Sequence, residues 1–427
     1  MIIRMNLLEN RQRLLFWLLA VLSVASLLLF LGSSLFNTKG EPREAIVALS
    51  MLQSGDWVSP VNNGVDIAYK PPFFHWCIAL CSLLMGRVTG FTARFPSAFA
   101  TIVMLLSSYC YMLKNKVDPR LAFLTGLITM TTFEVHRAAM ACRVDMMLSV
   151  LLLSGAFLTK GPVGALLPCM VMGVYMLVRR ENFFRAFFCC MVFFLASCLL
   201  PLCWYYLAYL ERGDRFLYLV YEENVLRFTG KMVYSSHEGP AIYNVQTLLT
   251  GFLPYTLLLL FSLFAFRYRR LRLTVGVSGW LKKCWSRVSN LSDQDLLALL
   301  SAVIVFVFYC IPKSKRSVYL LPVYPFLSYY LARFMLWIAG NRRSMANVYG
   351  WVLSVIALLL PVLTFVTRMG LVPHGIFHGK HASENLAYLS GLEHLSLSFP
   401  LVLALVFTFV GILVFVRSRK TGGGYRL

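Results

Sequence analysis

The chain has 427 residues, of which 59% are apolar and only 14% are charged. A soluble chain of this size would carry far more charge on its surface, so the composition excludes a multidomain cytosolic enzyme, a disordered chain and a disulfide-stapled secreted module. The formal net charge of +22 lies in short basic clusters between apolar runs, a pattern that follows membrane topology rather than nucleic-acid binding. The sequence therefore predicts a membrane protein with no nucleic-acid partner.

Apolar runs along the chain predict ten membrane-spanning helices. They lie at residues 14–35, 95–113, 121–133, 161–178, 186–210, 243–266, 296–311, 318–337, 345–366 and 399–416. The segments on one side of the membrane hold most of the basic residues and few acids, which places both termini in the cytoplasm. We expect an all-α integral membrane protein of about ten spans, in contact with membrane lipids.

Two segments on the outer side, residues 36–94 and 211–242, are longer than a connection requires, and long loops commonly carry function. Residues 42–52 begin with a proline and place apolar residues on one helical face, which predicts an amphipathic helix at the membrane surface. Residues 73–85 form an apolar run too short to cross the hydrocarbon layer, so we expect a second interfacial helix there.

Short motifs follow one another in a fixed order on and between these outer segments. They are Glu41-Pro-Arg43, Ser54-Gly-Asp-Trp57, Lys70-Pro-Pro72, Arg94-Phe-Pro-Ser-Ala98, Asp145-Met-Met147, Thr159-Lys-Gly161, Glu222-Glu-Asn-Val-Leu-Arg227, and Lys313-Ser-Lys315 with Tyr319. Taken in this order, they resemble the membrane-embedded GT-C glycosyltransferases of the aminoarabinose transferase and protein O-mannosyltransferase group. One such motif alone would be a weak signal, whereas the ordered series is specific.

The resemblance implies a GT-C type helical bundle, with residues 1–420 as a single membrane domain and residues 421–427 as a flexible cytoplasmic tail. It also implies a glycosyltransferase of the bacterial inner membrane that needs no cofactor and has its active site on the periplasmic face. Such an enzyme moves a sugar from a polyprenyl-phosphate donor to lipid A or another cell-envelope acceptor, with inversion at the anomeric carbon.

Two alternatives stay open at this stage. One is a protein O-glycosyltransferase of the same fold, and the other is a multispan transporter of an amphipathic envelope precursor. A transporter would need polar or charged residues along a path through the membrane and repeated halves, whereas the predicted spans are nearly free of acids and the sequence has no internal repeat.

Transfer from a polyprenyl phosphate requires cations that hold the phosphate and a carboxylate that accepts the proton of the incoming hydroxyl. By resemblance, the catalytic carboxylates are Glu41 and Asp145. The donor phosphate is expected at Lys70, Arg227, Lys313 and Lys315. The other substrate-binding candidates are Arg43, Asp56, Trp57, Tyr69, His75 and Tyr319.

The residues alone leave other roles open for several of these side chains. Glu41 also suits the N-terminus of a helix, where the dipole favours an acid. Asp145 could pair with Arg143 or Arg137, and Lys315 could extend toward lipid headgroups.

The sequence also departs from the family pattern in its outer loops. The family commonly has an acid before the first glutamate, where Gly40 stands here. Tyr69 and Asn224 replace the acid and the histidine that the aminoarabinose transferases have in their loops, so no metal site is expected. Asp56 and Trp57 could equally serve as a turn residue and an interfacial anchor.

Overall fold

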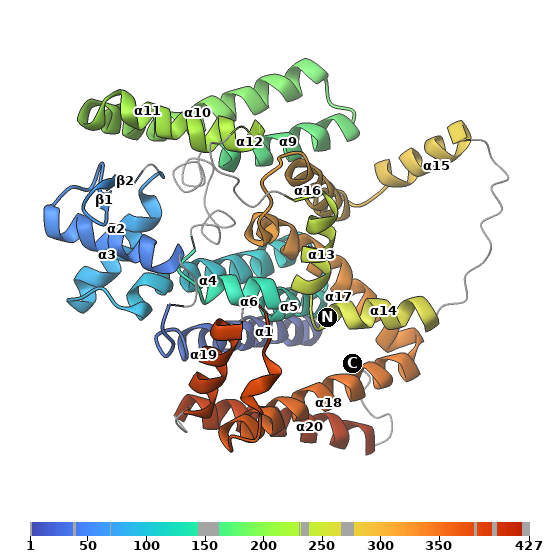
Figure 1. Cartoon of the computed structure of the whole chain (residues 1–427). Coiled ribbons are helices and arrows are strands. Elements are labelled where there is room, and N and C mark those ends of the chain that lie inside the picture. The colour runs from blue at the N-terminus through green and yellow to red at the C-terminus, as the bar shows by residue number, and fades with distance from the viewer. Residues whose placement is uncertain are drawn as a thin grey trace. The chain divides into compact units, whose positions relative to one another are not determined.

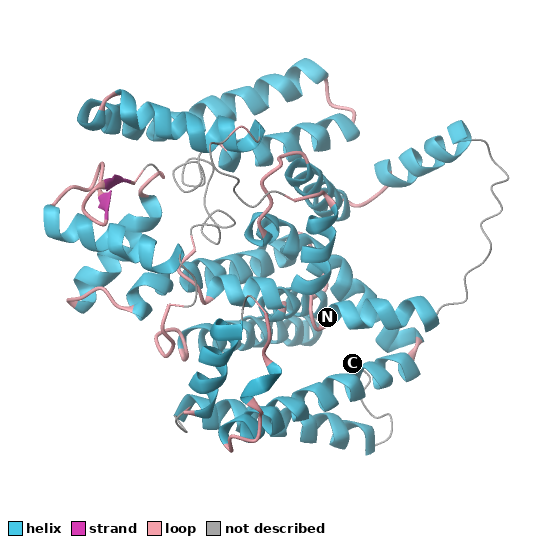
Figure 2. Ribbon diagram, in the orientation of Figure 1, coloured by secondary structure: helices cyan, strands magenta, loops and turns pink. Residues whose placement is uncertain are grey.

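The structure, a computed structural model, describes residues 2–36, 40–68, 70–143, 162–229, 231, 239–265, 277–379, 382–394 and 399–420. Within these ranges the secondary structure is helical apart from one hairpin of two short strands (Figure 2). The strands are β1 (Val61–Asn62) and β2 (Asp66–Ile67), paired antiparallel.

The helices are numbered in chain order (Figure 1). Those before residue 240 are α1 (Ile2–Leu28), α2 (Gly40–Ser54), α3 (Phe73–Met85), α4 (Gly90–Lys114), α5 (Pro119–Thr131), α6 (Phe133–Ala139), α9 (Val163–Val178), α10 (Phe183–Arg212), α11 (Asp214–Tyr221), the π-helical η1 (Glu222–Leu226) and the short turn α12 (Arg227–Thr229). Those after it are α13 (Ile242–Gly251), α14 (Tyr255–Ala265), α15 (Val277–Ser289), α16 (Asp293–Cys310), the 3₁₀ helix η2 (Ser317–Val323), α17 (Tyr324–Asn341), α18 (Arg343–Arg368), the 3₁₀ turn η3 (His374–Ile376), α19 (Ala382–Glu393) and α20 (Phe399–Lys420).

Each predicted span coincides with a helix or with two consecutive helices, so the expected helical multispan architecture is confirmed. Five described helices are long and apolar enough to cross a membrane by themselves, and they lie in α1, α4, α10, α16 and α18. The span predicted at residues 243–266 is two helices rather than one, because α13 ends at Gly251 and α14 begins at Tyr255. Pro254, which has no amide hydrogen, lies between them and cannot continue the ladder of α13.

The chain divides into two compact units, residues 1–256 with 266–336 and residues 257–265 with 337–427. In the smaller unit, α18 packs against α19 and α20. A Cβ atom on Gly350 would lie 2.3 Å from the ring of Phe415, so the missing side chain lets α18 and α20 approach closely. The predicted tail at residues 421–427 lies outside the described part of the chain.

The centre of the larger unit is built from α1, α4 and α5, which pack side by side (Figure 1). Thr89 and Thr92 form a capping box that starts α4, and the side chain of Asp118 caps the first turn of α5. A Cβ atom on Gly126 would lie 2.8 Å from Leu19, so this glycine permits close packing of α5 on α1. These helices form the frame on which α2 and α3 rest.

The two short helices predicted in the first outer segment are present as α2 and α3, and they pack against each other and against α4. Their apolar faces form one buried cluster that includes Ala45, Ala48, Phe74, Ile78 and Ala93. The surface helix predicted from Pro42 begins two residues earlier, at Gly40, so that Glu41 lies in its first turn. The frame of α4 therefore fixes the orientation of the two helices that carry Glu41, Arg43 and His75.

Candidate functional site

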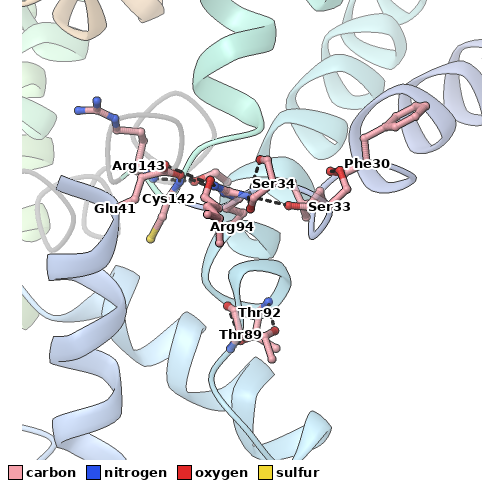
Figure 3. A network of polar contacts seen from close by, with 12 residues as sticks. Phe30, Ser33, Ser34, Glu41, Thr89, Thr92, Arg94, Cys142 and Arg143 are labelled. Atoms are coloured by element: carbon pink, nitrogen blue, oxygen red, sulfur yellow. Dashed lines mark hydrogen bonds and ion pairs between the residues drawn. The ribbon is translucent and has the colours of Figure 1, made fainter. Parts of the chain in front are cut away.

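Arg94, on the first turns of α4, forms the most connected polar group of the first outer segment (Figure 3). Its side chain is 1% exposed, and its Nε donates to Oε1 of Glu41 over 3.0 Å. The two terminal nitrogens donate to the carbonyl oxygens of Leu31, Ser34 and Leu35 over 3.1, 2.9 and 2.8 Å. One buried guanidinium thus fixes the start of α2 to α4 and to the segment that follows α1.

Glu41 also binds the chain that leaves α6. The backbone N–H of Cys142 donates to its Oε1 over 2.9 Å. Ser97 exchanges two further hydrogen bonds with the backbone of Arg143, at 3.0 and 3.2 Å. Residues 142 and 143 are therefore fixed to α2 and α4, and Asp145, which follows two residues later, lies outside the described part of the chain.

This geometry bears on the role expected for Glu41. Its carboxylate is 1% exposed and binds a buried arginine and a backbone amide, which are contacts of a structural residue. A general base must come within hydrogen-bond distance of the proton that it removes. The described contacts fix Glu41 against α4 and against residues 142 and 143. Of the two arginines considered as partners of Asp145, Arg137 pairs with Glu134 at 2.6 Å.

A second group of charges is centred on Glu44, one helical turn after Glu41. Its Oε1 accepts from Nζ of Lys70 over 2.7 Å and from a terminal nitrogen of Arg43 over 2.9 Å. Its Oε2 lies 2.6 Å from Nε2 of His75, on α3. The structure thus brings together three residues that the sequence proposed as binding residues, around a fourth that it did not.

Glu44 is 5% exposed, and its electrostatic environment keeps it charged. Burial alone would raise the pKa of its carboxyl. The charge of Lys70, the hydrogen bond of His75 and the charge of Arg43 outweigh burial and hold that pKa well below its usual range. The side chain of Lys70 is 31% exposed, so this cation lies between a buried carboxylate and the surface.

The sequence contained a signal for Glu44 that motif matching did not use. Glu41 and Glu44 are three residues apart, which places both on one face of a helix. That face is the one that packs toward α3 and α4, as the burial of Ala45 and Ala48 shows. A carboxylate on the buried face of an amphipathic helix needs a cationic partner, and Arg43, Lys70 and Arg94 are the nearest motif cations in the sequence.

Asp56 and Trp57 support the loop between α2 and β1. The Asp56 carboxylate accepts from the backbone N–H of Ser59 over 2.8 Å and pairs with Arg212, at the end of α10, over 3.1 Å. The carbonyl oxygen of Trp57 accepts from the indole N–H of Trp76 over 2.7 Å. The Asp56 contacts fit the turn considered as its alternative role, and they join α10 to the loop that leads to Lys70.

The remaining cations lie on other elements of the larger unit. Arg227 forms an ion pair with Glu223 next to η1, and Lys313 is exposed in the loop after α16. Lys315 is 5% exposed, and its Nζ donates to the carbonyl oxygens of residues 309, 310 and 312 over 3.2, 2.7 and 2.5 Å. Lys315 therefore caps the C-terminus of α16. Tyr319 stacks on Tyr309 with ring centroids 5.4 Å apart.

Tyr69 lies outside the described residues. Among the described residues, no group of three or more His, Cys, Asp or Glu side chains is arranged to hold a metal ion. Nδ1 of His75 is buried and has no hydrogen-bond partner among them.

Similarity to known proteins agrees with the motif series. The chain is 24% identical over 396 residues to the undecaprenyl phosphate-alpha-4-amino-4-deoxy-L-arabinose arabinosyl transferase of Edwardsiella ictaluri, covering 85% of this chain and 67% of that protein. It is 25% identical over 386 residues to an uncharacterized protein of Aquifex aeolicus, covering 81% of this chain and 70% of that protein. No protein-family model matches the chain.

The fold has a solved counterpart. The crystal structure of ArnT from Cupriavidus metallidurans bound to undecaprenyl phosphate superposes with a TM-score of 0.67 at 21% identity, covering 94% of this chain and 72% of that one. The ligand-free crystal structure of the same protein gives a TM-score of 0.65. In sequence the chain is similar to the aminoarabinose transferases and in fold to ArnT, as the motif series predicted.

Proposed function

We propose that this protein is a glycosyltransferase that uses a polyprenyl-phosphate sugar as donor and works at the outer face of the bacterial inner membrane. The observation that carries the proposal is the group around Glu44, in which Lys70 is fixed in the loop between β2 and α3 with its ammonium partly exposed. A lysine so placed supplies a compact charge for a phosphate. Named relatives and the ArnT fold support the same donor class.

In this proposal some residues contact the substrates, whereas Glu41 has a structural role. Lys70 binds the donor phosphate, and Arg227 and Lys313 are further cations for it. Asp145 accepts the proton of the acceptor hydroxyl. Glu41 supports the chain before Asp145 through Arg94 and Cys142, and it does not react.

The acceptor is proposed to be lipid A or another cell-envelope molecule, because the relatives of known name are aminoarabinose transferases. A protein hydroxyl is the competing acceptor, since the same motif series resembles the protein O-mannosyltransferases. Mass spectrometry of lipid A and of envelope proteins, from cells with and without the gene, distinguishes the two. A gene-dependent sugar on lipid A supports the first, and one on proteins alone replaces it with the second.

Purified protein tests the donor class. With a polyprenyl-phosphate sugar and a membrane extract as acceptor, it should release free polyprenyl phosphate. Lys70→Ala should abolish the release in a folded protein, whereas Lys282→Ala, which removes an exposed lysine on α15, should leave it unchanged. Release that requires a nucleotide sugar, or that survives Lys70→Ala at a near-normal rate, would overturn the proposal for the donor or for Lys70.

A further inference from the structure

The Glu44 group has an unusual charge arrangement for a phosphate site. One carboxylate oxygen is shared by two cations, Lys70 at 2.7 Å and Arg43 at 2.9 Å. The carboxylate is buried, while the side chains of Lys70 and Arg43 are 31% and 42% exposed. The carboxylate therefore lies behind the cations as seen from the surface. Its other oxygen faces His75, away from them.

Lys70 can bind Glu44 and a ligand at once. Its ammonium has three N–H groups, and Glu44 is its one hydrogen-bond partner among the described residues, so two N–H groups are available. A phosphate on the open side of Lys70 would contact the cation directly and would also experience the repulsion of the carboxylate behind it. Glu44 thus orients the ammonium and at the same time reduces the positive charge of the site.

The transfer reaction changes the charge of the lipid phosphate. The bond between the anomeric carbon and the phosphate oxygen breaks, and its electron pair stays on that oxygen. The acceptor oxygen bonds to the anomeric carbon and loses its proton to the base. The donor is a phosphodiester with one negative charge, whereas the released lipid phosphate is a monoester that carries nearly two above its second pKa of about 6. A site formed by two cations alone would bind the product more tightly than the donor.

We propose that Glu44 is a positioning residue that also promotes product release, by weakening the attraction of Lys70 and Arg43 for the monoester more than for the diester. This inference rests on the proposed function, because it assumes that the phosphate binds at Lys70. The proposal gives a role to Glu44, which the sequence motifs did not single out.

The size of the effect follows from Coulomb's law. We take a separation of about 6 Å between the Glu44 carboxylate and the bound phosphate, and an effective dielectric constant of about 40. Repulsion by Glu44 then lowers the affinity of the ligand about tenfold for each unit of negative charge on its phosphate. Glu44→Gln should therefore favour the monoester over the diester by about tenfold relative to the wild type. The side-chain oxygen of glutamine can still accept the hydrogen bond from Lys70, so the ammonium keeps its orientation and the ratio reports the lost charge.

The test measures binding of undecaprenyl phosphate and of its methyl phosphodiester to purified protein at pH 8. In Glu44→Gln the monoester-to-diester affinity ratio should rise about tenfold. Two control variants should leave the ratio unchanged. Glu44→Asp keeps the charge, and Glu181→Gln removes a carboxylate that pairs with Arg185 of α10. Glu44→Asn provides the same neutral test if the glutamine variant does not fold.

The outcomes separate this inference from the proposed function. If the wild type binds undecaprenyl phosphate, Lys70→Gln weakens that binding, and Glu44→Gln leaves the ratio unchanged or lowers it, the inference about Glu44 is wrong while the phosphate site stands. If Lys70→Gln has no effect on binding, the site itself is misplaced and both fail.

Discussion

Glu41→Gln tests the structural role of the buried ion pair. Both side chains of the pair with Arg94 are 1% exposed, so the substitution leaves a buried guanidinium without its counter-charge. Removal of one partner of such a pair typically costs about 3–5 kcal/mol. Because Arg94 keeps the carbonyl oxygens of residues 31, 34 and 35 as acceptors, we expect the lower end of this range, about 3 kcal/mol.

A loss of about 3 kcal/mol in the free energy of unfolding lowers the ratio of folded to unfolded protein by more than about a hundredfold. The assay is the apparent unfolding temperature of purified protein in detergent, together with hydrogen exchange of the Cys142 amide, which donates to Glu41. We expect earlier unfolding and faster exchange. Turnover per folded molecule should fall less than the roughly 10²- to 10⁴-fold typical of a lost general base.

Two further variants complete this test. Glu181→Gln removes one partner of an exposed pair, so it should change stability by about 1 kcal/mol or less. Changing both Glu41 and Arg94 to glutamine should recover part of the loss, because no unpaired charge remains buried. If Glu41→Gln unfolds like the wild type and yet does not transfer sugar, Glu41 takes part in the chemistry and the structural assignment is wrong.

Two other substitutions test the packing and the cation assignments. Gly251→Ala should destabilise the protein by about 1–3 kcal/mol, because its Cβ atom would lie 1.9 Å from the Tyr324 hydroxyl, and Tyr324→Phe in the same chain should recover part of the loss in thermal unfolding. Lys315→Met should lower the unfolding temperature, because three carbonyl oxygens at the end of α16 lose the ammonium that hydrogen-bonds to them. The KM for the polyprenyl-phosphate sugar should stay near normal. Lys313→Met, at an exposed position, should leave stability unchanged; equal stability of the two variants would contradict the capping role of Lys315.

The sequence was informative about the helices because apolar runs leave few alternatives in a membrane. Each predicted span coincides with a helix or with two consecutive helices, and the short run at residues 73–85 forms α3. The break between α13 and α14 was not predicted, although Pro254 marks its position, because proline also occurs inside long helices such as α10 and α18.

The candidate site was only partly predictable for a different reason. Motifs identify residue types at fixed spacings, and the candidates Arg43, Lys70 and His75 all fell within residues 36–94, where the structure brings them to Glu44. They did not identify which carboxylate these residues would contact, since that depends on how α2 turns its face toward α3. Glu44 and the pairing of Glu41 with Arg94 follow from tertiary packing, which the spacing of residues along the chain does not record.

The central claim is that the lipid phosphate binds at Lys70, and a structure of this protein with undecaprenyl phosphate tests it most directly. We expect a phosphate oxygen within hydrogen-bond distance of Nζ of Lys70, with Glu44 still bonded to the same ammonium from its buried side. A phosphate bound at Lys313 or elsewhere, with Lys70 in contact with Glu44 alone, would contradict the claim.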